Sequence, residues 1–229
     1  LSAYDLFDVD EQYGSIQSST TEQAMTSAIM NLTDSNPISV VFLEGFGSNG
    51  RTDSSNLESL LTNNGYLVSS INFLSEDIPE DADAVVLCSP TSDLTSELAD
   101  KLALWLENDG KFGHTLLYFA DGSQPSLPVL EGVLNEWGIG VESGFLAETD
   151  PSHVYNSYTY LLGEYVDNDY VESSDKPVLL PNAKALTALW DVESNRYTHV
   201  LLNTYDTAVI VPEDADENWQ LTDGEQGTY

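Results

Sequence analysis

The stretch of residues 38–90 constrains the fold of this chain more than any other part of it. Three apolar, β-branched runs within it have the length and composition of buried strands: residues 38–43, 66–73 and 84–88. Between the first two runs, Leu57, Leu60 and Leu61 recur at the spacing of one helical face. Strands that alternate with helices form parallel sheets, because a tight turn cannot join two parallel strands. This stretch therefore predicts an α/β fold.

The same alternation continues further along the chain. Thr95 is placed to cap a helix whose apolar stripe is Leu98, Leu102, Trp105 and Leu106. Further elements are predicted as strands at residues 116–120 and 141–145 and as a short helix at residues 127–137. We predict a three-layer α/β fold with a mostly parallel sheet, helical crossovers and β additions at its C-terminal end.

The length of the chain limits the number of domains. Its 229 residues suffice for one large domain or two small ones. We expect a single α/β domain over residues 1–229, with a core at residues 20–150 and a C-terminal β-rich extension at residues 151–229, where helical periodicity fades. The acidic residues from Glu213 onward are predicted to be a frayed end.

The charge of the chain excludes one class of partner. It contains 39 Asp and Glu against 6 Lys and Arg, a formal net charge of -33. Nucleic-acid binding needs clustered cations that release counterions from the phosphate backbone, so we exclude it. The same field disfavours anionic membrane surfaces. No run approaches eighteen apolar residues, so we expect membrane attachment only through segments absent from this chain.

A glycine-rich loop follows the first predicted strand of this stretch. Gly45, Gly47 and Gly50 spell the dinucleotide-binding pattern G-x-G-x-x-G. In that motif the third glycine lies in the first turn of the helix, whereas six polar residues follow Gly50 before the first leucine. Asn72 stands at the end of the next strand, where an acidic residue would bind the ribose. We therefore interpret the loop as a structural turn and expect no cofactor.

The only cysteine is a candidate nucleophile. Cys88 closes a predicted strand, where an α/β fold can present such a group, and His114, His153 or His199 can be proposed as its base. It is followed by Ser89 and a proline, instead of the small residues of a nucleophile elbow. A buried structural cysteine is the favoured interpretation, and an amidotransferase-like or hydrolase-like enzyme using Cys88 is the alternative.

No group of residues has the spacing of a metal site. The three histidines lie far apart in the sequence and far from Cys88. Asp8, Asp10 and Gln12 resemble the start of a calcium loop, but Tyr13 stands where that loop needs glycine and Ser19 where it needs a bidentate glutamate. We expect no metal.

Aromatic residues gather in the second half of the chain. The tyrosines are Tyr155, Tyr158, Tyr160, Tyr165 and Tyr170, and Trp190 and Trp219 follow them. Such a set is typical of a partner-binding or sugar-stacking face, which makes a carbohydrate-binding surface a further alternative. It is equally typical of the surface of a β subdomain.

Several blocks of this sequence together resemble a known family. They are TTEQAMTSAIMNLTD, VVFLEGFGSN, LESLLTNNGYLVSSINF, IPEDADAVVLCSPTSDLTSELADKLALWLENDGK, LLYFADG and LNEWGI. This series is similar to the extracytoplasmic domain of the GldG-like, gliding-motility-type auxiliary components of ABC transporters. The sequence departs from the family pattern at Phe46, where the loop usually carries histidine, and at Ser48, where it often carries glutamate.

The resemblance implies a fold, a location and partners. It implies a flavodoxin-like or class I amidotransferase-like domain without the amidotransferase nucleophile. It also implies a bacterial, membrane-anchored protein whose soluble domain lies at the extracytoplasmic face of the cell membrane and assists an ABC permease and ATPase. From this and from the missing catalytic set, we expect a non-enzymatic binding or scaffolding domain.

A ligand site in such a fold is expected at one edge of the sheet. Open α/β sheets bind ligands outside the carboxyl ends of their strands. The residues predicted there are Glu44, Gly45, Phe46, Gly47, Ser48, Ser89, Asp121 and Gly122. We expect a ligand-binding role for these residues and no catalytic role.

Overall fold

A computed structural model describes most of the chain in two compact units. The described residues are 7–9, 15–19, 21–33, 35–47, 54–166 and 176–229. Unit 1 comprises Leu1–Cys88 and Lys101–Tyr118, and unit 2 comprises Ser89–Asp100 and Phe119–Tyr229. The expectation of a single domain with a β-rich extension from residue 151 stays a prediction, because units defined by contacts need not fold independently.

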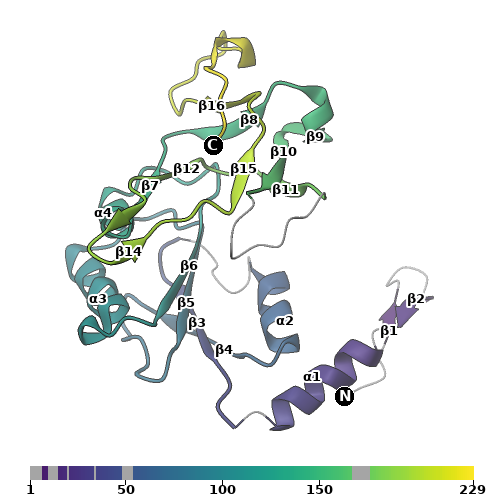
Figure 1. The fold of residues 1–229 in the computed structure, drawn as a ribbon, viewed down its shortest axis with the longest axis vertical. Coiled ribbons are helices and arrows are strands. Elements are labelled where there is room, and N and C mark those ends of the chain that lie inside the picture. The colour runs from purple at the N-terminus through teal and green to yellow at the C-terminus, as the bar shows by residue number, and fades with distance from the viewer. Residues whose placement is uncertain (1–6, 10–14, 20, 34, 48–53, 167–175) are drawn as a thin grey trace. The chain divides into compact units, whose positions relative to one another are not determined.

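Unit 1 is built around a four-stranded parallel sheet. The strands are β3 (Ser39–Glu44), β4 (Leu67–Asn72), β5 (Ala84–Cys88) and β6 (Thr115–Phe119), in the spatial order β4-β3-β5-β6 (Figure 1). β3 pairs in parallel with both β4 and β5. Four consecutive residues of β3, from Val40 to Leu43, are buried, as expected for a strand that is covered on both faces.

Helices cover the two faces of this sheet. In α2 (Ser55–Asn63), Leu57 and Leu61 pack against the face that carries Val40 and Phe42. Because side chains alternate along a strand, Val41 points to the opposite face. The later turns of α3 (Ser96–Glu107) lie on the other side of the sheet from α2 (Figure 1). The predicted stripe of α3 is buried at Leu98, Leu102 and Leu106.

The predicted cap of α3 is confirmed. The N–H of Leu98 donates a hydrogen bond to Oγ1 of Thr95 at 3.3 Å. The N–H of Ala99 donates to the backbone oxygen of Thr95 at 3.0 Å. Thr95 therefore satisfies two of the N–H groups that the start of a helix leaves unpaired.

The beginning of unit 1 forms a hairpin and a helix. β1 (Phe7–Val9) pairs antiparallel with β2 (Ile16–Ser19), and α1 (Thr21–Thr33) follows. The apolar and aromatic residues of 1–9 also predict a strand there; the structure describes it only in β1, since residues 1–6 lie outside the described part. On α1, Met25 and Ile29 are exposed, although their spacing predicts a common apolar face.

One crossover of the parallel sheet lacks a helix. Residues 73–83 connect β4 to β5 through turns, in which the N–H groups of Ser75 and Glu76 donate to the oxygen of Asn72 and the N–H of Ala82 donates to that of Pro79. A crossover between parallel strands is usually helical, so this thin connection leaves space beside α3 that a helix would otherwise fill.

The described part of unit 2 contains several small antiparallel sheets, the first residues of α3 and the helix α4 (Pro128–Glu136). Its strands are β7 (Ile139–Val141), β8 (Phe145–Glu148), β9 (Val154–Tyr155), β10 (Ser157–Tyr165), β11 (Val178–Pro181), β12 (Leu186–Ala188), β13 (Val192–Glu193), β14 (Arg196–Tyr197), β15 (Leu202–Thr204) and β16 (Ala208–Val211). β8 pairs with β16, β7 with β12, β13 with β14, and β10 with β9, β11 and β15. Three short 3-10 helices, η2 (Asn108–Gly110) in unit 1 and η3 (Pro151–His153) and η4 (Leu221–Asp223) in unit 2, complete the described elements.

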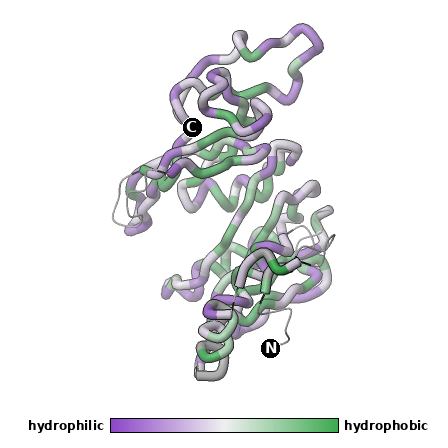
Figure 2. The backbone as a smooth tube through the Cα atoms, turned by 90° about the vertical axis from the view of Figure 1, so that its right-hand side faces the viewer, coloured by the Kyte–Doolittle hydropathy of each residue, from purple (hydrophilic) through white to green (hydrophobic). Residues whose placement is uncertain are grey.

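The β8–β16 pair is the centre of unit 2. On one face, Leu146 and Ala208 pack with Leu161 of β10, and on the other, Ala147 and Val209 form a second cluster. Figure 2 shows hydrophobic and hydrophilic stretches alternating along the backbone. Burial on both faces explains why the short β8 and β16 are almost wholly apolar.

The C-terminal segment is part of the core of unit 2, so the prediction of a frayed end is wrong. Trp219 and Leu221 pack against the Val209 cluster, and Tyr229 packs against the Leu161 cluster. The N–H of Thr204 also donates to the oxygen of Tyr229 at 2.9 Å. Three apolar side chains among many acidic ones suffice to keep this segment packed on the core. The free energy gained by burying them exceeds the repulsion among the exposed charges beside them.

The predicted three-layer α/β fold, flavodoxin-like or class I amidotransferase-like, is wrong for the molecule. The parallel sheet has four strands, and several small antiparallel sheets make up the remainder, which gives a mixed fold. The expected fifth strand at residues 141–145 is the reason: β7 pairs antiparallel with β12, and β8 pairs antiparallel with β16. Within the described residues, no helix has the length and apolar character needed to cross a membrane.

Candidate functional site

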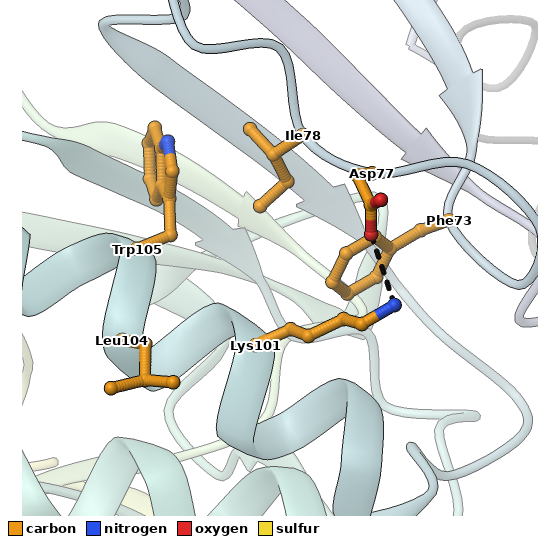
Figure 3. A pocket seen from close by; sticks show the side chains of 6 residues that line it. All are labelled: Phe73, Asp77, Ile78, Lys101, Leu104 and Trp105. Carbon is orange, nitrogen blue, oxygen red and sulfur yellow. Dashed lines mark hydrogen bonds and ion pairs between the residues drawn. The ribbon is translucent and has the colours of Figure 1, made fainter.

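Two adjoining hollows lie in unit 1 between residues 73–80 and α3. The smaller one, of about 240 Å³, is lined by Phe73, Asp77, Ile78, Lys101, Leu104 and Trp105 (Figure 3). The larger one, of about 410 Å³, is lined by Ile78, Glu80, Leu104, Trp105, Asn108, Asp109 and His114. Because Ile78, Leu104 and Trp105 border both hollows, we treat them as one site and call it the indole groove.

The periodicity of α3 presents one wall of the groove. Lys101, Leu104 and Trp105 stand three and four positions apart, so they share a helical face that is distinct from the buried stripe. Leu104 is 67% exposed and borders both hollows. The face is open because the crossover opposite it contains no helix.

The crossover forms the other wall. Phe73 is fully buried and its ring meets that of Phe46 edge-on, with centroids 6.1 Å apart, which fixes one end of the segment. Across the groove, Nζ of Lys101 lies 2.9 Å from Oδ1 of Asp77 (Figure 3). Both side chains are well exposed, so this ion pair positions the walls without adding much stability.

The indole of Trp105 is held in place by His114. The two rings stack with centroids 4.3 Å apart and planes 13° apart. Nδ1 of His114 lies 2.6 Å from the backbone oxygen of Trp105. Because a carbonyl oxygen only accepts, Nδ1 carries the proton of this hydrogen bond. Nε1 of Trp105 is buried and has no hydrogen-bond partner among the described residues.

The larger hollow carries uncompensated negative charge. Neither Glu80 nor Asp109 forms an ion pair with a basic side chain within the described part of the chain.

Asn108 and Asp109 have φ of 46° and 54°, so the chain leaves α3 in a left-handed turn that these residue types tolerate. Asn108 donates Nδ2 to the oxygen of Phe112 at 2.9 Å, which steadies the turn.

The groove has the composition of a binding site. It combines an aromatic and aliphatic floor with a few polar groups, which is the usual arrangement of ligand sites, and the volume of the larger hollow falls within their usual range of roughly 300–1,000 Å³. None of its lining residues is a serine, threonine or cysteine.

The residues predicted at the strand ends lie in both units. In unit 1, Glu44 ends β3, Phe46 is 1% exposed in the core, and Gly47 is exposed. Gly45 has φ of 113°, and a Cβ there would come within 2.8 Å of Cγ of Leu74, so only glycine fits. Ser48 lies outside the described residues.

The remaining members of that set belong to unit 2. The N–H of Ser89 donates to the oxygen of Phe119 at 2.9 Å. Asp121 accepts hydrogen bonds from the N–H and hydroxyl of Ser123, and the N–H of Gly122 donates to the oxygen of Asn182. These groups are engaged in turns, and a ligand site formed by the set stays a prediction.

The sequence pattern does not reveal the indole groove. Trp105 has the spacing of the buried stripe of α3, and Glu80 and Asp109 look like the many other acidic residues of the chain. The usable signal was Ile78 and Pro79, which interrupt the connection between two predicted strands and so indicate a crossover without a helix.

The position of Cys88 does not favour a nucleophile. Its side chain is buried at the end of β5, and Oγ of Ser54 lies 2.8 Å from its Sγ. His114, the histidine of unit 1, immediately precedes β6. The N–H of Thr115, the first residue of β6, donates to the oxygen of Asp83, which immediately precedes β5. His114 therefore lies near the start of β5, whereas Cys88 lies at its end. The five residues of β5 span about 16 Å, too far for a hydrogen bond.

Two of the predicted aromatic residues share a face of β10. Tyr158 and Tyr160 are 50% and 37% exposed, whereas Leu161, on the other face, is fully buried. Tyr170 lies outside the described residues, and Trp219 belongs to the core of unit 2. Tyr155 and Tyr165 are also exposed, at 58% and 38%.

The comparisons with known proteins concern the fold. No protein-family model matches this chain, and no curated protein matches it. A solved structure described as mmIFT52 N-terminal domain is similar, with a TM-score of 0.56 and 14% sequence identity over 74% of this chain and 74% of that chain. At this identity, the likeness is one of fold alone.

Proposed function

We propose that this chain is a non-enzymatic binding or scaffolding domain and that the indole groove is its binding site. The observation that carries the proposal is the exposure of Leu104 beside a rigidly stacked Trp105 in a hollow with unpaired carboxylates. Keeping an exposed leucine and an indole in such a hollow costs solvation free energy, which a bound partner recovers.

We propose further that the domain belongs to an auxiliary protein of an ABC-type transport system of the GldG-like family. In this proposal it lies at the extracytoplasmic face of the bacterial cell membrane, anchored by segments absent from this chain, and its partners are the ABC permease and ATPase. The support is the series of sequence blocks from residue 20 to residue 139. An acidic surface suits a soluble domain held near, but not on, an anionic membrane.

The test is crosslinking of the full-length protein in its native membrane, followed by affinity purification and mass spectrometry. We expect an ABC permease and its ATPase among the crosslinked proteins. Recovery of intact bait crosslinked only to proteins unrelated to transport would overturn the proposed setting.

The non-enzymatic reading is tested at Cys88. A buried thiol at a strand end should react with a disulfide reagent at least tenfold more slowly in the folded protein than in urea. Fast reaction of the folded protein would favour the alternative of an amidotransferase-like or hydrolase-like enzyme.

A carbohydrate-binding surface is the second candidate, because Tyr158 and Tyr160 project from the same face of β10. Two exposed rings spaced along a strand are suited to stacking on sugars. We would measure binding on a glycan array with the wild type and with a Tyr158→Ala/Tyr160→Ala variant. Hits that vanish in the variant would support this candidate, and the absence of hits would remove it.

A further inference from the structure

We infer that the indole groove receives an arginine side chain from a partner protein. The inference rests on the proposed binding function and names the chemistry of the occupant. It depends on three features of the described residues. They are the unpaired carboxylates of the larger hollow, the stacked indole, and the ion pair that already compensates the carboxylate of the smaller hollow.

The carboxylates of Glu80 and Asp109 favour a cationic occupant. Glu80 and Asp109 border the larger hollow without a basic partner within the described residues. An apolar occupant would displace water from both carboxylates without forming hydrogen bonds to them, and this loss of hydration is costly for a charged group. An anionic occupant would be repelled by them and by the net charge of the chain.

The aromatic floor favours arginine over lysine. A planar guanidinium stacks on an indole, and the stacked rings of Trp105 and His114 both line the larger hollow. Its five N–H groups offer donors for the carboxylates of Glu80 and Asp109 and for Oδ1 of Asn108, which accepts no hydrogen bond within the described residues. A lysine ammonium is compact and strongly hydrated, so it matches this border less well.

The two hollows divide the occupant into a charged and an apolar part. In the smaller hollow, Asp77 already faces Lys101 at 2.9 Å, so this end offers mainly the apolar surface of Ile78 and Leu104 (Figure 3). The guanidinium therefore belongs in the larger hollow. The smaller hollow accommodates an aliphatic side chain next to the arginine in the partner segment.

The test uses a minimal probe and its neutral isostere. N-acetyl-L-arginine methylamide and N-acetyl-L-citrulline methylamide have nearly the same shape, and only the first is charged. Each is titrated into the whole chain at about 0.15 M salt, where long-range attraction is screened. The readout is the NMR signal of the Trp105 indole N–H, assigned by its loss in Trp105→Phe. We expect the arginine probe to shift this signal with a dissociation constant on the order of millimolar, and citrulline to bind at least tenfold more weakly.

A matched pair of variants separates the groove from the general charge. Glu80→Gln/Asp109→Asn removes two carboxylates from the larger hollow, and asparagine tolerates the left-handed backbone at residue 109. Asp214→Asn/Glu217→Gln removes two exposed carboxylates in unit 2. We expect the first variant to weaken arginine binding about fivefold and the second to leave it unchanged within twofold. Equal weakening by both variants, equal binding of citrulline, or no shift of the Trp105 signal would overturn the inference.

The same variants distinguish this inference from the proposed function. In the membrane crosslinking experiment, the full-length protein with Glu80→Gln/Asp109→Asn should recover about fivefold less partner than the wild type. Equal recovery would overturn the arginine site and leave the binding function standing. Failure of the wild type to recover any partner would instead count against the proposed function, whatever the probe titration shows.

Discussion

Lys184 is a buried cation in a chain that has few cations. Its side chain is 1% exposed, and its Nζ lies 3.1 Å from Oε1 of Glu213, whose own side chain is 42% exposed. The N–H of Gly144 also donates to Glu213, at 3.4 Å. The pair joins the segment after β16 to the turns before β8 and β12. Because Lys184 is buried and Glu213 is partly exposed, the two side chains contribute unequally to stability.

This asymmetry predicts unequal losses of stability. Glu213→Gln leaves the ammonium of Lys184 buried without a counter-charge, and we expect a loss of about 3 kcal/mol in the free energy of unfolding. Lys184→Met fills the same space with an apolar chain and leaves Glu213 able to hydrate, so we expect a loss of about 1 kcal/mol. Urea unfolding at neutral pH measures both. Equal losses, or a larger loss in Lys184→Met, would show that the ammonium is not dependent on Glu213.

The pair also predicts a dependence on pH. The hydrogen bond from Lys184, followed by that from the Gly144 N–H, holds the pKa of Glu213 below its ordinary value of 4.5. A carboxyl whose pKa is lowered by folding stabilises the protein above its ordinary pKa, and this contribution is lost as the pH falls through the folded value. The stability difference between wild type and Glu213→Gln should therefore be constant from pH 7 to about pH 4.5 and shrink below it. In a Lys184→Met background the difference should lose most of this dependence, because the main cause of the lowered pKa is gone.

At the scale of elements, two glycines end helices in the same backbone conformation but in different surroundings. Gly110, after α3, and Gly138, after α4, have φ of 75° and 83°. A Cβ on Gly110 would meet nothing within 4 Å, whereas one on Gly138 would come within 2.8 Å of the Trp190 ring and collide with Oγ1 of Thr198. The backbone cost of alanine is common to both sites, and the packing cost is not.

Alanine substitutions should therefore differ in their effect. We expect Gly110→Ala to lower the free energy of unfolding by about 1 kcal/mol, the cost of a left-handed alanine. Gly138→Ala should cost about 2 kcal/mol more, because Trp190 and Thr198 must move. Thermal unfolding followed by circular dichroism measures both variants. Similar losses of free energy in the two variants would mean that Trp190 and Thr198 can move away from an alanine at position 138 without destabilising the protein.

The start of α4 depends on a residue distant in the sequence. The N-terminal residues of α4 have no cap from Leu127, and instead Asp93 accepts the N–H of Val129 at 2.8 Å and that of Leu130 at 3.0 Å. Asp93→Ala should lower the free energy of unfolding by about 2 kcal/mol, because both donors lose a charged acceptor. Asp214→Ala, at an exposed site, is the control and should change it by less than about 0.5 kcal/mol. A similar small change in Asp93→Ala would show that water replaces the cap.

The sequence predicted those elements that local pattern determines. The strands near residues 38–43 and 84–88 and the capped helix after Thr95 are present, because burial on both faces and helical periodicity are local properties. The pairing of β7 with β12 was not predictable in the same way. A strand of three residues carries too little pattern to specify a partner 45 to 49 residues away, and its antiparallel pairing depends on the tertiary packing of unit 2.

At the scale of the whole molecule, the candidate site was hidden for a related reason. Trp105 has the spacing of a core residue, and its role changes only because residues 73–83 cross the sheet without a helix. Glu80 and Asp109 become distinctive only when they border the same hollow. The sequence holds the residues of the groove, but it does not show which elements are missing from its surroundings.

The charge of the molecule predicts how its stability responds to salt. With 39 acidic and 6 basic residues, most carboxylates repel one another in the folded state, where they are closer together than in the unfolded chain. Between about 0.01 and 0.1 M NaCl, the Debye length falls from about 30 to about 10 Å, so this repulsion is screened. We expect the Tm to rise by roughly 3 °C over this range, which corresponds to about 1 kcal/mol for a chain of this size. Tetramethylammonium chloride at the same ionic strength should give the same rise, because screening does not depend on the identity of the cation. A rise with sodium alone would indicate specific cation binding, and an unchanged Tm in both salts would mean that the carboxylates are spaced widely enough not to limit stability.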